Sequence, residues 1–137
     1  MRTALDTNVL SALWSGEPSA EDIKSALFKA RSEGGLVICA PVYCELLAHP
    51  SSTRNFVQKF CAETGIFVDF LLEEQVWQQT AEAFVTYAQR RRRSRGGSPK
   101  RMLVDFVVAS HALLHADRLM TLDPSRYQRD FPTLRLF

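Results

Sequence analysis

The sequence predicts an α/β fold with a central, parallel, five-stranded sheet that carries helices on both faces. Two features of the 137-residue chain predict this architecture. Short apolar runs alternate with longer segments of helical periodicity, as in folds whose parallel strands lie between covering helices. One segment late in the chain, V-D-F-V-V-A-S-H-A-L-L, is a helical pattern that is apolar on most sides, so we expect it to be buried. The length suits a single domain over residues 1–137.

The expected strands are short apolar runs bounded by polar or turn-forming residues. They cover residues 3–5, 36–39, 66–69, 119–121 and 134–137. The expected helices begin near residue 9 and cover 19–34, 41–49, 53–63, 73–93 and 98–116. Ser19 with Asp22 forms a capping-box-like start, Gly34 supplies a stop, and Ser98 before Pro99 predicts the beginning of the last helix.

The composition excludes several classes of protein. No apolar run approaches the roughly 18 residues that span a bilayer, and Asp6 and Asn8 interrupt any apolar core of a signal peptide. We therefore expect a cytoplasmic protein with no membrane partner. Three cysteines, Cys39, Cys44 and Cys61, include no C-x-x-C pair, which argues against a disulfide framework and a thiolate zinc site. We expect all three to be small buried hydrophobes.

Basic residues are concentrated in one segment. The net charge is +2, but residues 90–101 hold seven of the 17 basic residues and no acid, which leaves ten basic residues against 15 acids elsewhere. Two interpretations stay open: a solvated helix end whose arginines complement the helix dipole, and a phosphate-binding patch suited to RNA. The seven residues are Arg90, Arg91, Arg92, Arg93, Arg95, Lys100 and Arg101.

Four acids stand where an apolar core pattern is otherwise expected. Asp6 follows the first strand, and Glu45 lies one turn into the helix after the second strand. Asp105 lies in the second turn of the apolar late helix, and Asp123 ends the fourth strand. Ligands of open parallel sheets bind beyond the carboxyl ends of the strands. We therefore expect these four acids to converge at that edge.

Each acid also has a purely structural interpretation. Asp6 or Asn8 is suited to cap the helix that begins near residue 9, and Glu45 to complement a helix dipole. Asp123 before Pro124 is typical of a turn. Asp105 is the exception, because a charge within an apolar helix costs several kcal/mol unless it is paired or coordinated.

Converging carboxylates need a compensating charge. Two carboxylates about 5 Å apart repel by roughly 3 kcal/mol at an effective dielectric near 20. A set of oxygen ligands without cysteine or histidine suits Mg²⁺ or Mn²⁺ better than zinc. Such ions keep open positions for phosphate oxygens, so the chemistry that this pattern favours is phosphodiester hydrolysis.

The acids stand in motifs that are informative together. These motifs are L-D-T-N-V-L at the N-terminus, C-E-L around Glu45, D-F-V-V-A-S-H-A from Asp105 and L-M-T-L-D up to Asp123. Over nearly the whole chain they resemble the PIN-domain family, and specifically the VapC-type toxins of bacterial and archaeal toxin–antitoxin pairs. The run T-L-D-P-S-R-Y departs from the frequent T-x-N pattern of that family, so Asp130 is an alternative to Asp123.

The resemblance implies a Mg²⁺- or Mn²⁺-dependent endoribonuclease that cuts structured RNA such as tRNA or rRNA and inhibits translation. It implies products with a 5′-phosphate and a 3′-hydroxyl. By this resemblance Asp6, Glu45 and Asp105 bind the principal ion, while the acid at position 123 completes the site or assists a second ion. Asn8 and Thr121 orient ligands or water. The implied partners are a second copy of the chain and an antitoxin whose C-terminal segment covers the acidic pocket.

Other classes of function remain open at this stage. His111 and His115 share a helical face, but without H-E-x-x-H we interpret them as packed or helix-end histidines rather than zinc ligands. Trp14, Trp77 and Tyr87 lie in helical patterns that favour packing over base stacking. A receiver domain of a signalling system requires a paired early acid and a late lysine, which the chain lacks. A PIN-like domain that binds RNA or protein without cutting it is the remaining alternative.

Overall fold

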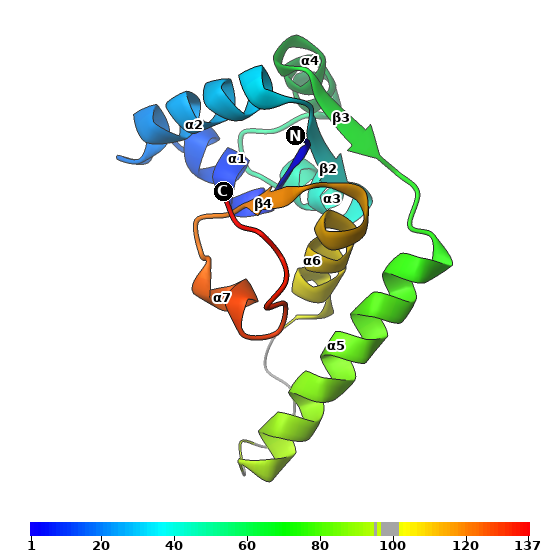
Figure 1. Cartoon of the computed structure of the whole chain (residues 1–137). Coiled ribbons are helices and arrows are strands. Elements are labelled where there is room, and N and C mark those ends of the chain that lie inside the picture. Colours follow the sequence, from blue (N-terminus) through cyan, green and yellow to red (C-terminus); the bar gives the residue numbers. More distant parts are fainter. Residues whose placement is uncertain (95, 97–101) are drawn as a thin grey trace.

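The sheet has four parallel strands in the order β3-β2-β1-β4 (Figure 1). The computed structural model describes residues 1–94, 96 and 102–137. The strands are β1 (Thr3–Leu5), β2 (Leu36–Cys39), β3 (Ile66–Asp69) and β4 (Arg118–Met120). The first three have the predicted bounds, and β4 begins one residue before the predicted run. Because all pairs are parallel, the strands end at one side of the sheet, which we call the carboxyl edge.

The predicted fifth strand at residues 134–137 is wrong. This segment contributes only an isolated parallel bridge between Leu136 and Leu119, with two backbone hydrogen bonds to β4. The chain turns sharply just before it, where the amide of Leu134 donates to the carbonyl of Phe131 at 3.1 Å. The turn leaves too few residues in register with β4 to form a strand.

The predicted helices are present, with small differences at their ends. The helices are α1 (Thr7–Trp14), α2 (Ala20–Glu33), α3 (Ala40–Leu47), α4 (Arg54–Thr64), α5 (Glu74–Arg93), α6 (Leu103–His115) and α7 (Ser125–Gln128). The short helix α7 was not predicted. No described helix is both long and apolar enough to cross a membrane.

Local capping explains several of the helix ends. Thr53 caps α4, since its hydroxyl accepts from the amide of Phe56 at 3.1 Å, and Gly65 ends the helix with a φ of 71°. Ser19 precedes α2 but makes no capping hydrogen bond with its side chain, contrary to the prediction. The predicted start at residues 98–99 lies outside the described residues. Because α6 begins at Leu103, Asp105 occupies its first turn rather than the second.

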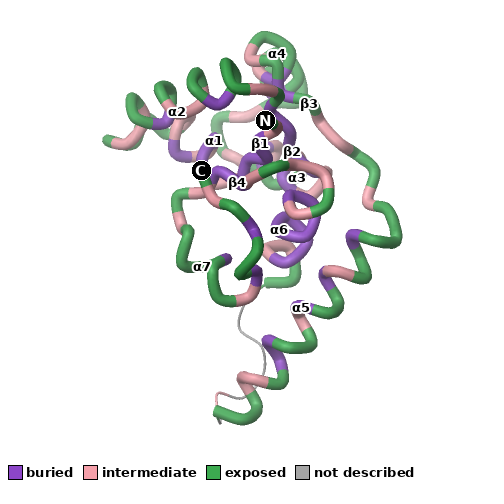
Figure 2. The backbone as a smooth tube through the Cα atoms, viewed as in Figure 1, coloured by how far each residue is buried: buried purple, intermediate pink, exposed green. Residues whose placement is uncertain are grey.

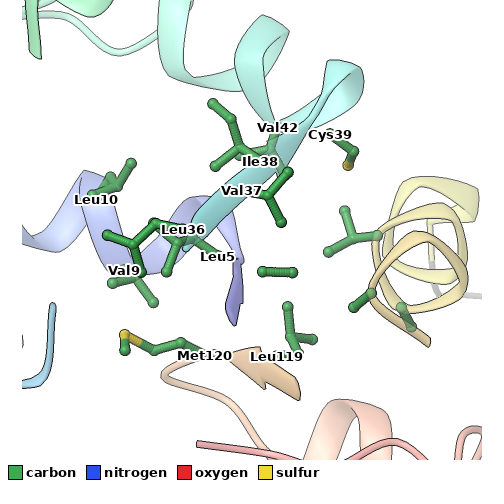
Figure 3. Packing of buried hydrophobic residues seen from close by; sticks show 14 of the residues in the cluster. Leu5, Val9, Leu10, Leu36, Val37, Ile38, Cys39, Val42, Leu119 and Met120 are labelled. Atoms are coloured by element: carbon green, nitrogen blue, oxygen red, sulfur yellow. The ribbon is translucent and has the colours of Figure 1, made fainter. Parts of the chain in front are cut away.

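The core fills the space between the sheet and its helices. Strand β2 is coloured as buried in Figure 2. Leu5, Val37 and Ile38 of the strands are almost fully buried, and α1 lies on one side of the strands with α6 on the other (Figure 3). Residues 106–112 of α6 are all buried, which confirms the expectation for this helix. Each fully buried Leu, Val or Ile stabilises the fold by about 1.5–3 kcal/mol.

The cysteines divide between core and surface. Cys39 and Cys61 are buried, as predicted, whereas Cys44 is exposed. Helix α3 buries Val42 and Leu46, and Cys44 lies between these positions on the opposite side of the helix. All three are free thiols.

Candidate active site

Asp6 is the buried centre of the carboxyl edge. It follows β1 directly and is only 6% exposed. Its Oδ1 accepts a hydrogen bond of 2.8 Å from the amide of Thr7, so it caps α1, as one of the structural interpretations predicted. A capping role leaves the second carboxylate oxygen for other partners.

Two hydroxyl groups from the C-terminal part of the chain hold that second oxygen. Thr121 Oγ1 donates to Asp6 Oδ2 at 2.9 Å, and Tyr127 Oη donates to the same atom at 2.8 Å. Tyr127 is fully buried. Burial, followed by the negative charge of Asp6, raises the pKa of the Tyr127 hydroxyl, which therefore stays protonated and donates. The two donors fix the orientation of the Asp6 carboxylate.

Asn8 and Thr121 belong to the same hydrogen-bond network. Asn8 Nδ2 donates to Thr121 Oγ1 at 3.3 Å, and Asn8 Oδ1 accepts from the amide of Leu122 at 3.1 Å. The amide of Asp123 in turn donates to Thr121 Oγ1 at 3.1 Å. These bonds tie the first turn of α1 to the chain that follows β4.

Glu45 reaches the network through a threonine. Thr7 Oγ1 donates to Glu45 Oε1 at 2.7 Å, and Glu45 itself is exposed. The end of β2 lies near both acids: burial, and to a smaller extent the charges of Asp6 and Glu45, raise the pKa of the Cys39 thiol to about 11. Asp6 and Glu45 therefore flank the same part of the carboxyl edge.

Asp105 and Asp123 form a second pair, which is joined by an arginine. Arg126 Nη1 lies 3.5 Å from Asp105 Oδ1, and its Nε lies 3.2 Å from Asp123 Oδ2. Partial burial disfavours the charged guanidinium, but the charges of Asp105 and Asp123 outweigh it and raise the pKa of Arg126. The guanidinium thus offsets part of the repulsion between the two carboxylates.

The four acids surround one edge as two pairs rather than as one tight cluster. Among residues 1–94, 96 and 102–137, no three Asp, Glu, His or Cys side chains are grouped closely enough to hold a metal ion. The donor chemistry nevertheless suits a hard divalent cation, because every acid at the edge offers carboxylate oxygens as ligands.

The comparison with family models identifies the family. The model described as PIN domain matches residues 3–132. The chain belongs to the PIN domain family. The family resemblance predicted from the motifs is confirmed.

Solved structures share the fold of this PIN domain. VapBC2 from Rickettsia felis, bound to a DNA fragment from its promoter, aligns with a TM-score of 0.70 and 20% identity over 100% of this chain and 98% of that chain. For VapBC-1 from nontypeable Haemophilus influenzae, the TM-score is 0.68 at 23% identity, over 100% and 97% of the chains. For a toxin–antitoxin complex from Klebsiella pneumoniae, it is 0.64 at 18% identity, over 98% and 95%. A comparison with curated proteins found no match.

Asp130, the alternative to Asp123, has a different partner in this PIN domain. Its side chain is only 4% exposed and forms an ion pair with Arg90 Nη2 at 2.5 Å. The side chain of Asp123 is 41% exposed and contacts Arg126, which also contacts Asp105. The geometry therefore associates Asp123, rather than Asp130, with the other acids.

The predicted basic segment is only partly a free surface. Arg90 pairs with Asp130, and Arg91 donates to the carbonyl of Gly96. Arg92 and Arg93 are exposed on the last turn of α5. The remaining members, at positions 95, 100 and 101, lie outside the described residues.

His111, His115 and Trp14 have packing partners. His111 Nε2 lies 3.0 Å from Asp69 Oδ2, and its ring is 5.4 Å from that of His115. Trp14 packs edge-on against the ring of Phe60 with centroids 5.2 Å apart. Trp77 is partly exposed. The described residues provide no third metal ligand beside the two histidines.

Sequence reasoning missed Arg126 and Tyr127. Both lie in the quoted run T-L-D-P-S-R-Y, in which only the acid was considered. A usable signal was present: Pro124 begins a short helix, and a tyrosine within it needs a partner for its hydroxyl if it is buried. That partner is Asp6.

Proposed function

We propose that this PIN domain is a metal-dependent endoribonuclease of the VapC type, which hydrolyses phosphodiester bonds in structured RNA such as tRNA or rRNA and thereby inhibits translation. The observation that carries the proposal is the carboxyl edge, where two hydroxyl groups donate to the buried carboxylate of Asp6. The other three acids lie at the same edge: Glu45 accepts a hydrogen bond from Thr7, and Arg126 contacts both Asp105 and Asp123. An acid fixed in this way is costly to bury without a function.

The acids would hold the ion. Asp6, Glu45 and Asp105 would bind the principal Mg²⁺ or Mn²⁺, and Asp123 would complete the site or assist a second ion. When bound, the ion supplies Lewis-acid stabilisation of phosphate oxygens and lowers the pKa of a water molecule. Carboxylate oxygens are the ligands that both ions prefer.

The neutral donors would keep the Asp6 carboxylate aligned. Tyr127 donates from a hydroxyl whose pKa is raised by burial, and Thr121 donates while it accepts from Asn8. Such outer partners of a ligand typically change metal affinity or activity by about 10–100-fold when they are removed. Hydrolysis would join the water oxygen to phosphorus and break the bond to the 3′ oxygen, leaving a 5′-phosphate and a 3′-hydroxyl.

The proposed partners are an antitoxin and a second copy of the chain. The Klebsiella structure is a toxin–antitoxin complex, which supports the first partner. Exposed apolar side chains at and after β3, namely Phe67, Phe70 and Leu71, support a protein contact on that side. Size-exclusion chromatography with light scattering of the free chain measures its oligomeric state. A monomer at all concentrations contradicts the proposed homodimer.

The decisive experiment incubates purified total tRNA and rRNA with the free protein, with Mg²⁺, with Mn²⁺ and with EDTA. We expect discrete fragments that need the metal and are absent with Asp6→Asn. Asp22→Asn is the matched control, because Asp22 is exposed on α2. Folded protein that binds RNA but cuts none with either metal supports the alternative, a PIN domain that binds without cleavage.

A further inference from the structure

A pocket lies between the end of α5 and helix α7, directly beside the acids. Its volume is about 310 Å³. Three arginines line it: Arg90 from α5, Arg126 from α7 and Arg129 just after α7. Ser125 and Asp123 also line it, and Asp123 is one of the acids of the candidate active site.

The charges of the pocket leave one positive charge without a partner. Arg90 pairs with Asp130, which also lines the pocket, and Arg126 pairs with Asp123. Arg129 is exposed, and no carboxylate within residues 1–94, 96 and 102–137 forms an ion pair with it. Three arginines against two aspartates favour an anion in the pocket.

The surrounding contacts hold the pocket in shape. The guanidinium of Arg90 lies 5.7 Å from the centre of the Tyr87 ring, which also lines the pocket and is almost fully buried. Ser125 Oγ donates to Asp123 Oδ1 at 2.9 Å. The charged groups on both sides are therefore ordered before any ligand binds, which reduces the entropy cost of binding.

Arg126 connects the pocket to the acids. It lines the pocket and also contacts Asp105 and Asp123. An anion in the pocket therefore lies next to the place where the proposed reaction occurs. A nucleic acid strand presents phosphates in succession, so one phosphate at the acids brings its neighbour close by.

We propose that this pocket binds the backbone phosphate that neighbours the cleaved one in the RNA, with Arg129 as its principal contact and Arg126 between the two phosphates. The inference rests on the proposed function, since the acids define which phosphate is cleaved. Arginine suits this task because its planar fork donates to two phosphate oxygens at once. The pocket attracts RNA to an edge whose acids otherwise repel it.

The test measures RNA binding without cleavage. Fluorescence anisotropy in EDTA follows a short, fluorescein-labelled, single-stranded RNA across a range of salt concentrations, with wild-type protein, Arg129→Gln and Arg135→Gln. Arg135 is the matched control, because it is exposed and does not line the pocket. We expect Arg129→Gln to weaken binding several-fold at low salt and to lower the salt slope by about 0.7, the value for one phosphate contact on a single strand.

Two outcomes overturn the inference. In the first, Arg129→Gln binds RNA as Arg135→Gln does, or the wild-type protein does not bind the RNA at all. In the second, the wild-type protein broadens the ³¹P line of inorganic phosphate and Arg129→Gln does not, while the two proteins bind RNA with the same affinity. That result assigns the pocket to free phosphate. Circular dichroism of each variant verifies that it is folded.

The cleavage assay separates this inference from the proposed function. If the wild-type protein binds RNA through Arg129 but does not cut it, the result supports a phosphate-binding pocket and contradicts the proposed nuclease activity. If the wild-type protein cuts RNA but Arg129→Gln binds RNA as well as Arg135→Gln does, the result supports the nuclease activity and contradicts phosphate binding in the pocket.

Discussion

Two regions supply the candidate active site, and they are built in different ways. The β1–α1 junction, Thr3 to Trp14, places Asp6 by local rules: a short apolar strand, then a capping residue, then a helix. The segment from β4 to α7, residues 118–128, places Tyr127 by a contact to Asp6 across 121 positions of sequence. The first region is readable in the sequence, whereas the second depends on the whole fold. The partner of a site residue such as Tyr127 can therefore be identified only when the folded chain brings distant segments together.

The largest expected effect breaks the first region. We predict that Asp6→Asn lowers RNA cleavage at least about 100-fold, because it removes a ligand charge. Asparagine caps helices as well as aspartate does, so α1 is expected to keep its start. Asp105→Asn is expected to have the same effect on cleavage while the fold remains. Cleavage rates and circular dichroism measure these outcomes, and unchanged rates in either variant remove that residue from the site.

The next effect breaks the second region. Tyr127→Phe removes one donor to the buried Asp6 carboxylate, and we expect about 10–100-fold lower activity or metal affinity. We also expect a loss of about 1.5–3 kcal/mol in the free energy of unfolding, since the hydrogen bond is to a charged group. Urea denaturation and metal titration measure both.

Tyr43→Phe is the control for this substitution, because the Tyr43 ring packs against Phe70 and lies outside the Asp6 network. If Tyr127→Phe and Tyr43→Phe behave alike, the hydroxyl of Tyr127 does not support the site. If the double variant Asp6→Asn, Tyr127→Phe is no worse than Asp6→Asn alone, the two regions act as one unit.

A smaller effect sharpens the comparison by using charges outside both regions. We predict that replacing Arg92 and Arg93 by serine weakens RNA binding more at low salt than at high salt, because phosphate contacts release counterions. Both side chains are exposed at the end of α5. Anisotropy across a salt series measures the effect. If the RNA affinity of the variant and of the wild type depends on salt in the same way, Arg92 and Arg93 do not contact phosphate and form a solvated helix end.

The smallest effect concerns a pair that lies apart from the two regions. Burial lowers the pKa of His111, although its bond to Asp69 acts in the opposite direction. A histidine with a lowered pKa in the folded state is neutral there, so the unfolded chain takes up a proton first as the pH falls below the ordinary value of about 6.5. Stability is therefore expected to decline on acidification through that range.

The decline attributable to His111 is expected between about pH 7.5 and pH 5.5, a range that spans the ordinary pKa of histidine. Urea unfolding at the two pH values measures it, and His111→Gln should reduce the difference. His49→Gln is the control, since His49 is bonded to Ser15 and Ser51 instead. An equal pH dependence in His111→Gln and the wild type excludes His111 as the cause.

Much of the fold was predictable because it follows from local patterns. Strands β1, β2 and β3 have the expected bounds, and Thr53 and Gly34 mark helix ends where expected. The expected fifth strand failed because an apolar tetrad does not reveal the turn before it. The expected second-turn position of Asp105 failed because the beginning of α6 lies at Leu103.

The sequence by itself determined the alternation of strands and helices, the family, and the presence of acids at the ends of strands. Hydrophobic periodicity and capping act over a few residues, so they are visible without a structure. Only the tertiary structure decided that Arg126 joins Asp105 to Asp123, and that Tyr127 donates to Asp6. These contacts depend on a four-residue helix placed by distant packing, and no local energy term in the sequence specifies where such a helix lies.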